Sequence, residues 1–171
     1  FLTVGDDNAC DHESIQAAIN SGLSNTIRIA SNKNYFENLS SSDRSLHLIG
    51  GYSDCTMAGF NITDLSQGVL TGNGSDRVIE FLNSNAGNFE MTVRNLIVAN
   101  GSDGIYFTSQ NSANSTLTLN NVRAFNNDDS GINIVTVSGG QAETIINDSM
   151  IDFNTGGGVN CSGDNSNLKI T

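Results

Sequence analysis

The chain contains Asn73-Gly74-Ser75-Asp76, and the same four residues return as Asn100-Gly101-Ser102-Asp103. The interval between these two copies also separates a set of four asparagines, Asn73, Asn100, Asn127 and Asn154. Three glycines follow the same interval, Gly104, Gly131 and Gly158. The interval is about 27 residues, and a fixed period of about 20–50 residues is typical of proteins built from stacked repeats. The sequence therefore predicts a solenoid.

The segments between these markers are typical of β-strands, because they are short, rich in β-branched and aromatic residues, and bounded by turn-forming residues. The predicted strands are Phe89–Val93, Leu96–Ala99, Ile105–Thr108, Thr116–Leu119, Val122–Phe125, Ile132–Val137, Thr144–Ile146 and Met150–Phe153. The sequence lacks the periodicity of helical repeats and the Leu-x-x-Leu-x-Leu frame of leucine-rich repeats. About three strands per repeat, without hairpin spacing, predict an all-β solenoid, a parallel β-helix of about six coils.

The recurring asparagines are expected to stack in this fold. Successive coils lie about 4.8 Å apart, so the four side-chain amides are predicted to bond one to the next as a ladder. The period is not uniform, because Ile79 and Phe81 match the apolar pair of Ile105 and Phe107 better when the interval is shortened by one position. If one coil is shorter in this way, Asn126 takes the place of Asn127 in the ladder.

The N-terminal segment differs from the repeats. From His12 to Gly22 the sequence has the pattern of an amphipathic helix. Its apolar face is predicted to consist of Ile15, Ala18, Ile19 and Leu23. Asp11 is expected to cap the start of this helix, and Gly22 is expected to end it.

This helix is interpreted as a lid, because the first coil of a solenoid otherwise exposes an open apolar core. We divide the chain into an N-terminal cap with the helix, residues 1–25, and the β-helix coils, residues 26–171. The first strand is expected at Thr26–Ala30. A partner-binding helix is the alternative interpretation.

The three cysteines bear on whether the protein is secreted. A bridge between Cys10 and Cys55 would tie the cap to the first coils and would indicate secretion. Cys161 follows Phe107 and Ile134 at the repeat interval, so it is expected to be a buried apolar residue. The alternative, a nucleophilic or metal-binding Cys161, has no partner nearby in the sequence.

The charge balance excludes several partner classes. Seven basic and 18 acidic residues give a net charge of −11. Nucleic acid and anionic membrane surfaces require the opposite sign, so neither is an expected partner. No apolar run is long enough to span a bilayer, so membrane insertion is not expected. The strand predicted at Leu168–Thr171 has no cap after it, so we expect either a longer natural chain or end-to-end association through the open C-terminal coil.

Several segments resemble the cap and first coils of a known superfamily. They are Thr3-Val4-Gly5-Asp6, Cys10-Asp11, Ile15-Gln16-Ala17-Ala18-Ile19, Ile27-Arg28-Ile29-Ala30, Tyr35-Phe36-Glu37-Asn38 and Leu48-Ile49-Gly50-Gly51-Tyr52-Ser53-Asp54-Cys55. The chain is similar in these segments to bacterial right-handed parallel β-helix proteins of the pectin-lyase-like superfamily, especially surface proteins of the polymorphic outer membrane or β-helix repeat type. The resemblance implies a right-handed coil, a Cys10–Cys55 disulfide and a bacterial extracellular location. It leaves activity open, because the superfamily includes lyases, hydrolases, epimerases and adhesins.

Catalysis on this fold would require carboxylates or a basic residue on one face of the coils. The candidate carboxylates are Asp103, Asp128 and Asp129. The candidate bases are Arg94 and Arg123, whose separation is close to the repeat period, so they would be neighbours on adjacent coils. The sequence lacks the Gly-His-Gly and Arg-x-Lys patterns of such enzymes. The alternative interpretation makes these residues solvent-facing charges.

A cofactor is not expected, and calcium is the one ion that we consider. Its site would need several converging oxygen ligands, for which Asp6, Asp7 and Asp11 are candidates. Turns rich in Asp and Asn are also common without metal. The sequence as a whole favours a secreted or cell-surface module, a non-catalytic scaffold or adhesin that binds glycan or protein. The alternative is a carbohydrate-active enzyme, a polysaccharide lyase or glycoside hydrolase, or its N-terminal part.

Overall fold

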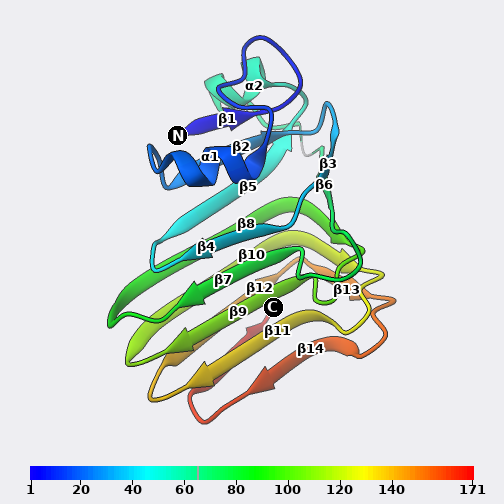
Figure 1. The fold of residues 1–171 in the computed structure, drawn as a ribbon. Helices are drawn as coiled ribbons and strands as arrows, with labels where there is room; N and C mark the ends of the chain where they lie inside the picture. Colours follow the sequence, from blue (N-terminus) through cyan, green and yellow to red (C-terminus); the bar gives the residue numbers. More distant parts are fainter. Residues whose placement is uncertain (65) are drawn as a thin grey trace.

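The strands of successive repeats pair in parallel, and each coil of the chain lies against the next. A computed structural model describes residues 1–64 and 66–171 and shows a parallel β-helix of about six turns (Figure 1). The predicted fold class is therefore confirmed. Within the described residues no helix is long and apolar enough to cross a membrane.

The strands form two sheets. The first contains β1 (Leu2–Val4), β2 (Thr26–Ala30), β3 (Asn34–Phe36), β5 (Leu46–Tyr52), β6 (Gly68–Thr71), β8 (Gly87–Ala99), β10 (Ala113–Phe125), β12 (Gln141–Asn147), β13 (Met150–Asp152) and β15 (Ser166–Ile170). The second contains β4 (Leu39–Ser42), β7 (Ile79–Asn83), β9 (Ile105–Gln110), β11 (Ser130–Val137) and β14 (Gly157–Ser162). Two helices, α1 (Ile15–Ser21) and α2 (Cys55–Phe60), lie at the N-terminal end of the stack (Figure 1).

Left-handed asparagines form the corners between these strands. Asn95 (φ 53°) and Asn121 (φ 50°) bend β8 and β10 in mid-strand, which joins pairs of strands that the sequence predicts as separate. Asn100 (φ 60°) and Asn126 (φ 54°) end the same two strands. Asn adopts this backbone region more readily than most residues, because its short polar side chain bonds locally. The recurrence of Asn thus follows largely from backbone geometry.

The four asparagines of the predicted ladder do not form one chain of amides. Asn126 donates its side-chain N–H to Asn100, because the register of β8 and β10 is 26 residues. Asn127 instead donates to Asn154 Oδ1 at 2.8 Å. Asn73 donates within its own turn, to Asp76 Oδ2 at 2.8 Å. In the shorter coil Asn126 therefore takes the place of Asn127 beside Asn100, as the alternative interpretation of the period predicts.

The helix α1 covers the first coils, and Ile15, Ala18 and Ile19 are buried in the core. Its N-cap is Ser14, not Asp11 as predicted, and the Ser14 hydroxyl accepts from Ala17 N at 3.1 Å.

Asp11 does not cap the helix because its carboxylate already binds strand β1, where it accepts from Thr3 N at 2.8 Å. At the other end of the helix, Gly22 is the C-cap as expected. Leu23 is 79 % exposed, so the prediction that it joins the apolar face is wrong.

The first strand is β1, which pairs with β2 and lies inside the segment predicted to be only a cap. A disulfide joins Cys10 to Cys55 at the start of α2, a short helix that the sequence analysis does not predict. Cys161 aligns with Ile134 on β11 as predicted, but it is exposed, because among the described residues β14 is the edge strand of the second sheet and pairs with β11 alone. The prediction that Cys161 is buried is therefore wrong.

Candidate functional site

The outer face of the second sheet carries an aligned row of polar side chains. The strands β4, β7, β9, β11 and β14 lie side by side (Figure 1), and their register aligns Ser40, Glu80, Tyr106, Asn133 and Asn160. Alternate residues of a strand face opposite sides, and the neighbours of this row, such as Ile79 and Phe81, are buried in the core. The row therefore faces outward, with successive residues about 4.8 Å apart.

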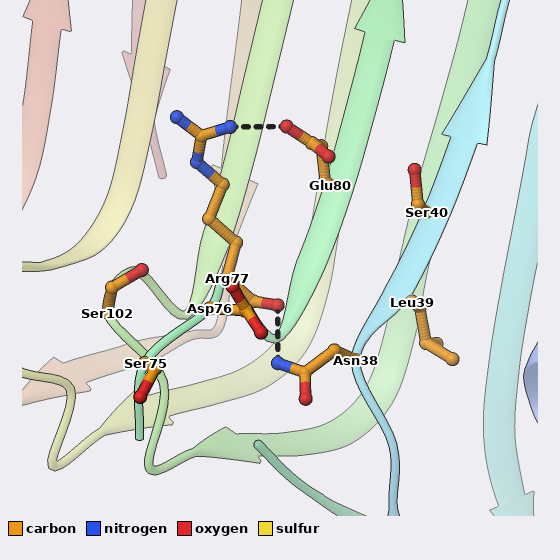
Figure 2. Close-up of a pocket in the computed structure, with 8 residues that line it drawn as sticks. All are labelled: Asn38, Leu39, Ser40, Ser75, Asp76, Arg77, Glu80 and Ser102. Atoms are coloured by element: carbon orange, nitrogen blue, oxygen red, sulfur yellow. Dashed lines mark hydrogen bonds and ion pairs between the residues drawn. The ribbon is translucent and has the colours of Figure 1, made fainter. Parts of the chain in front are cut away.

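A groove lies beside the N-terminal end of this row, where the chain enters β4 and β7. Its volume is about 370 Å³. Its lining consists of Asn38, Leu39, Ser40, Ser75, Asp76, Arg77, Glu80 and Ser102. Figure 2 shows that these residues come from three successive passes of the chain, and that Asn38 holds the Arg77 carbonyl through a hydrogen bond of 2.8 Å.

Arg77 is the central charge of the groove. Its Nη1 forms an ion pair with Glu80 Oε1, and the guanidinium stacks 3.3 Å from the centroid of the Tyr106 ring. Its Nε also lies 3.7 Å from Asp103 Oδ2. These contacts hold the side chain in place although 38 % of it is exposed. Arg77 is therefore a fixed part of the wall, with its charge largely balanced by neighbours.

Asp103 lies behind Arg77, and only 7 % of its side chain is exposed. Burial raises the pKa of Asp103, against the lowering effect of hydrogen bonds from Ser130 N and Asn133 Nδ2. The nearby Asp129 raises this pKa further, and Arg77 lowers it. The carboxyl group is thus enclosed by hydrogen-bond donors of the protein, and little of it is accessible from the groove.

The structure brings two of the predicted catalytic residues together, since Asp103 and Asp129 lie at one corner of adjacent coils. Asp128, also exposed, occupies the same turn. Arg123 lies on the first sheet, where it pairs with Asp152 at 3.0 Å. The predicted neighbours Arg94 and Arg123 are not aligned on adjacent coils, because Arg94 of β8 pairs in register with Asn120.

Arg77 and Glu80 are not among the residues predicted from the sequence to form a site. The signal was the shortened interval that matches Ile79 and Phe81 to the next coil, which also places Glu80 beside Tyr106. That match fixes where β7 begins, and therefore that Arg77 lies at the corner just before it. The interactions of Arg77 with Glu80 and Tyr106 could not be read from spacing alone.

The calcium candidates have other partners in the N-terminal segment. Asp7 accepts from Cys55 N at 3.1 Å and from Asn32 Nδ2 at 3.0 Å. Asp11 bonds to Thr3, and the backbone N–H of Asp6 donates to Asn32 Oδ1. In the part of the chain that the structure describes, the one metal-like group contains Asp7 with both disulfide cysteines. Cysteines joined to each other are not thiolate ligands, so this group is no metal centre.

Comparison with protein-family models, with curated proteins and with solved structures finds no match to this chain. The assignment to a parallel β-helix therefore stands on strand pairing and register.

Proposed function

We propose that the protein is an extracellular β-helix module that binds a glycan along the outer face of its second sheet, without cleaving it. The observation that carries this proposal is the aligned polar row, which begins at a groove lined by the hydroxyls of Ser40, Ser75 and Ser102. A sugar chain is extended and rich in hydroxyl groups. It suits a straight row of hydrogen-bonding side chains at regular steps.

The row is held in position before any ligand arrives. Asn160 donates to Asn133 Oδ1 at 3.1 Å, and Asn133 donates to Asp103 Oδ1 at 3.3 Å. Tyr106 is covered on one side by Arg77. A ligand that binds such fixed groups loses less side-chain entropy, and this favours affinity. Among the eight residues drawn in Figure 2, the three serine hydroxyls make no side-chain interaction with each other or with the rest.

An extracellular location is supported by the Cys10–Cys55 disulfide, which is compatible with an oxidising compartment. The acidic composition agrees with a surface or secreted protein that avoids nucleic acid. We also infer a relationship to the pectin-lyase-like surface proteins. Its support is the segment resemblance together with the helix that covers the first coils. A protein ligand in place of a glycan is an outcome of the binding test below.

A carbohydrate-active enzyme is the second candidate, favoured by the proximity of Asp103 and Asp129. Glycoside hydrolysis needs two carboxyl groups that both reach the sugar, one on each side of the scissile bond. Asp103 is enclosed and already accepts two protein hydrogen bonds. Asp129 is exposed on the turn. Because Asp103 is enclosed, the pair of Asp103 and Asp129 does not supply these two groups, and we favour binding without cleavage.

The test is a titration of the protein with a panel of soluble oligosaccharides, with and without calcium, by calorimetry. We expect binding to at least one glycan, and we expect Ser75→Trp, which fills the groove, to weaken it by about tenfold or more. Asn88→Trp adds the same bulk at an exposed position of β8, on the other sheet, and should leave binding unchanged. Binding to none of the glycans would overturn the proposal. Mass spectrometry of the products tests the enzyme hypothesis, because cleavage that disappears in Asp129→Asn would replace binding as the function.

A further inference from the structure

We propose that the groove selects glycans with free amino groups, such as oligomers of glucosamine, over acetylated or uronic-acid glycans. This inference rests on the proposed function and names its ligand class. It is carried by the charges that line the groove and by the interactions that already occupy its one cation.

The cation of the groove is not free to bind an anionic sugar. Arg77 is in contact with the Glu80 carboxylate and with the face of Tyr106, and Asp103 lies 3.7 Å from its Nε. A uronate would have to displace at least one of these partners to form a bidentate pair with the guanidinium. It would also approach a protein with a net charge of −11. Both effects disfavour polyuronides.

The other charged groups that line the groove are hydrogen-bond acceptors. The lining has one cation, Arg77, and two carboxylates, Asp76 and Glu80, so its formal charge is −1. Asp103 lies behind Arg77, and the exposed Asp129 lies close to Asp103; both carboxylates, when ionised, make the corner more negative still. Glu80 uses Oε1 for the ion pair, and its second oxygen makes no interaction in Figure 2.

An ammonium group fits this arrangement, because it carries three donors and no acceptor. The carboxylate of Glu80, the exposed Asp76 and the hydroxyls of Ser40, Ser75 and Ser102 can each accept from it. An N-acetyl group at the same sugar position has one donor, no charge and more bulk. The negative corner therefore favours the free amine electrostatically.

The experiment compares oligomers of equal length made of glucosamine, N-acetylglucosamine and galacturonic acid, titrated by calorimetry at about pH 5.5, where ordinary carboxylates are ionised. We expect the glucosamine oligomer to bind about tenfold more tightly than the acetylated one and the uronate to bind least. Raising the salt concentration from about 0.05 to 0.5 M should weaken the first interaction and leave the second nearly unchanged.

Two variants localise the effect. Glu80→Gln and Asp76→Asn each remove one groove charge, and each should reduce the preference for the amine by about threefold to fivefold. Glu80→Gln should also increase uronate binding, because it removes one of the two carboxylates that compete for Arg77. Glu90→Gln makes the same charge change at an exposed position of β8 and should change nothing.

The outcomes distinguish the two proposals. Equal affinity for amine and acetylated oligomers, or an amine preference that Glu80→Gln and Asp76→Asn leave intact, would overturn the selectivity while glycan binding stands. Tighter binding of the uronate would overturn it as well. Failure of all three oligomers and of the wider panel to bind would instead overturn glycan binding itself. Circular dichroism and melting of each variant show that the fold is retained.

Discussion

Asn95 shows how much of this fold depends on single residues. The residue is 2 % exposed and its φ is 53°, in the left-handed region. Its amide donates to Gly50 O at 3.3 Å and accepts from Asn121 Nδ2 at 2.9 Å. The residue therefore supplies a bend in β8 and a bridge between three successive coils. Few residue types meet both requirements.

We predict that Asn95→Ala lowers the free energy of unfolding by about 2–4 kcal/mol. About 1–2 kcal/mol comes from the left-handed backbone and about 1–2 kcal/mol from the buried partners left without the amide. Asn95→Gly keeps the backbone freedom, so it should cost only the second part. Urea denaturation measures both values, with Asn167→Ala on the exposed face of β15 as the neutral control. A cost below about 0.5 kcal/mol for Asn95→Ala would contradict this account.

At the scale of elements, the N-terminal cap is tied together by contacts between distant parts of the sequence. Glu37, just before β4, accepts from Ile15 N at 3.0 Å and Gln16 N at 2.9 Å, so it covers the N-terminus of α1. Asp7 likewise accepts from Cys55 N at the start of α2. The apolar periodicity of α1 predicts the helix itself. Its partner Glu37 lies far along the chain, beyond β2 and β3, and has no sequence signal.

The short helix α2 escapes prediction for a related reason. It spans six residues, of which only Cys55 and Ala58 are buried, and so few apolar positions define no helical period. The Gly50-Gly51-Tyr52 segment before it has the composition of a turn but belongs to β5. The glycines are required there for packing, because Asn95 occupies the space where a side chain at Gly50 or Gly51 would lie. Long-range packing overrides turn propensity at this point.

The disulfide is predicted to be the main covalent stabiliser of this cap. It closes a loop of 45 residues, so the chain-entropy model assigns it about 4 kcal/mol. The double variant Cys10→Ser/Cys55→Ser should therefore unfold at a clearly lower urea concentration than the wild type. Cys161→Ser is the matched control, since Cys161 is free and exposed. If the double variant and the control unfold at the same concentration, the disulfide contributes little and the cap is held by packing alone.

At the scale of the whole molecule, the sequence predicts the stack of coils but does not predict the groove. The period follows from the need to repeat the same buried positions, such as Phe81, Phe107 and Ile134, in every coil. The groove is built between Asn38 and Ser102, across coils of unequal length. Ser40 pairs in register with Glu80, a much longer interval than the period, and Glu80 pairs with Tyr106 at the shortened interval. The shortened interval predicts the second alignment, but the first departs from the period, so the sequence does not indicate that Asn38 and Ser40 meet Arg77 and Glu80.

Stacking also means that each coil depends chiefly on its immediate neighbours. Phe107 is fully buried in β9, between β7 and β11. We predict that Phe107→Ala costs about 3–5 kcal/mol by opening a cavity at the centre of the stack. In native-state hydrogen exchange the amides of β7, β9 and β11 should lose protection most, while β2 and β5 should retain more of theirs. Equal loss in all strands would show that the solenoid unfolds as a single cooperative unit, contrary to the nearest-neighbour description.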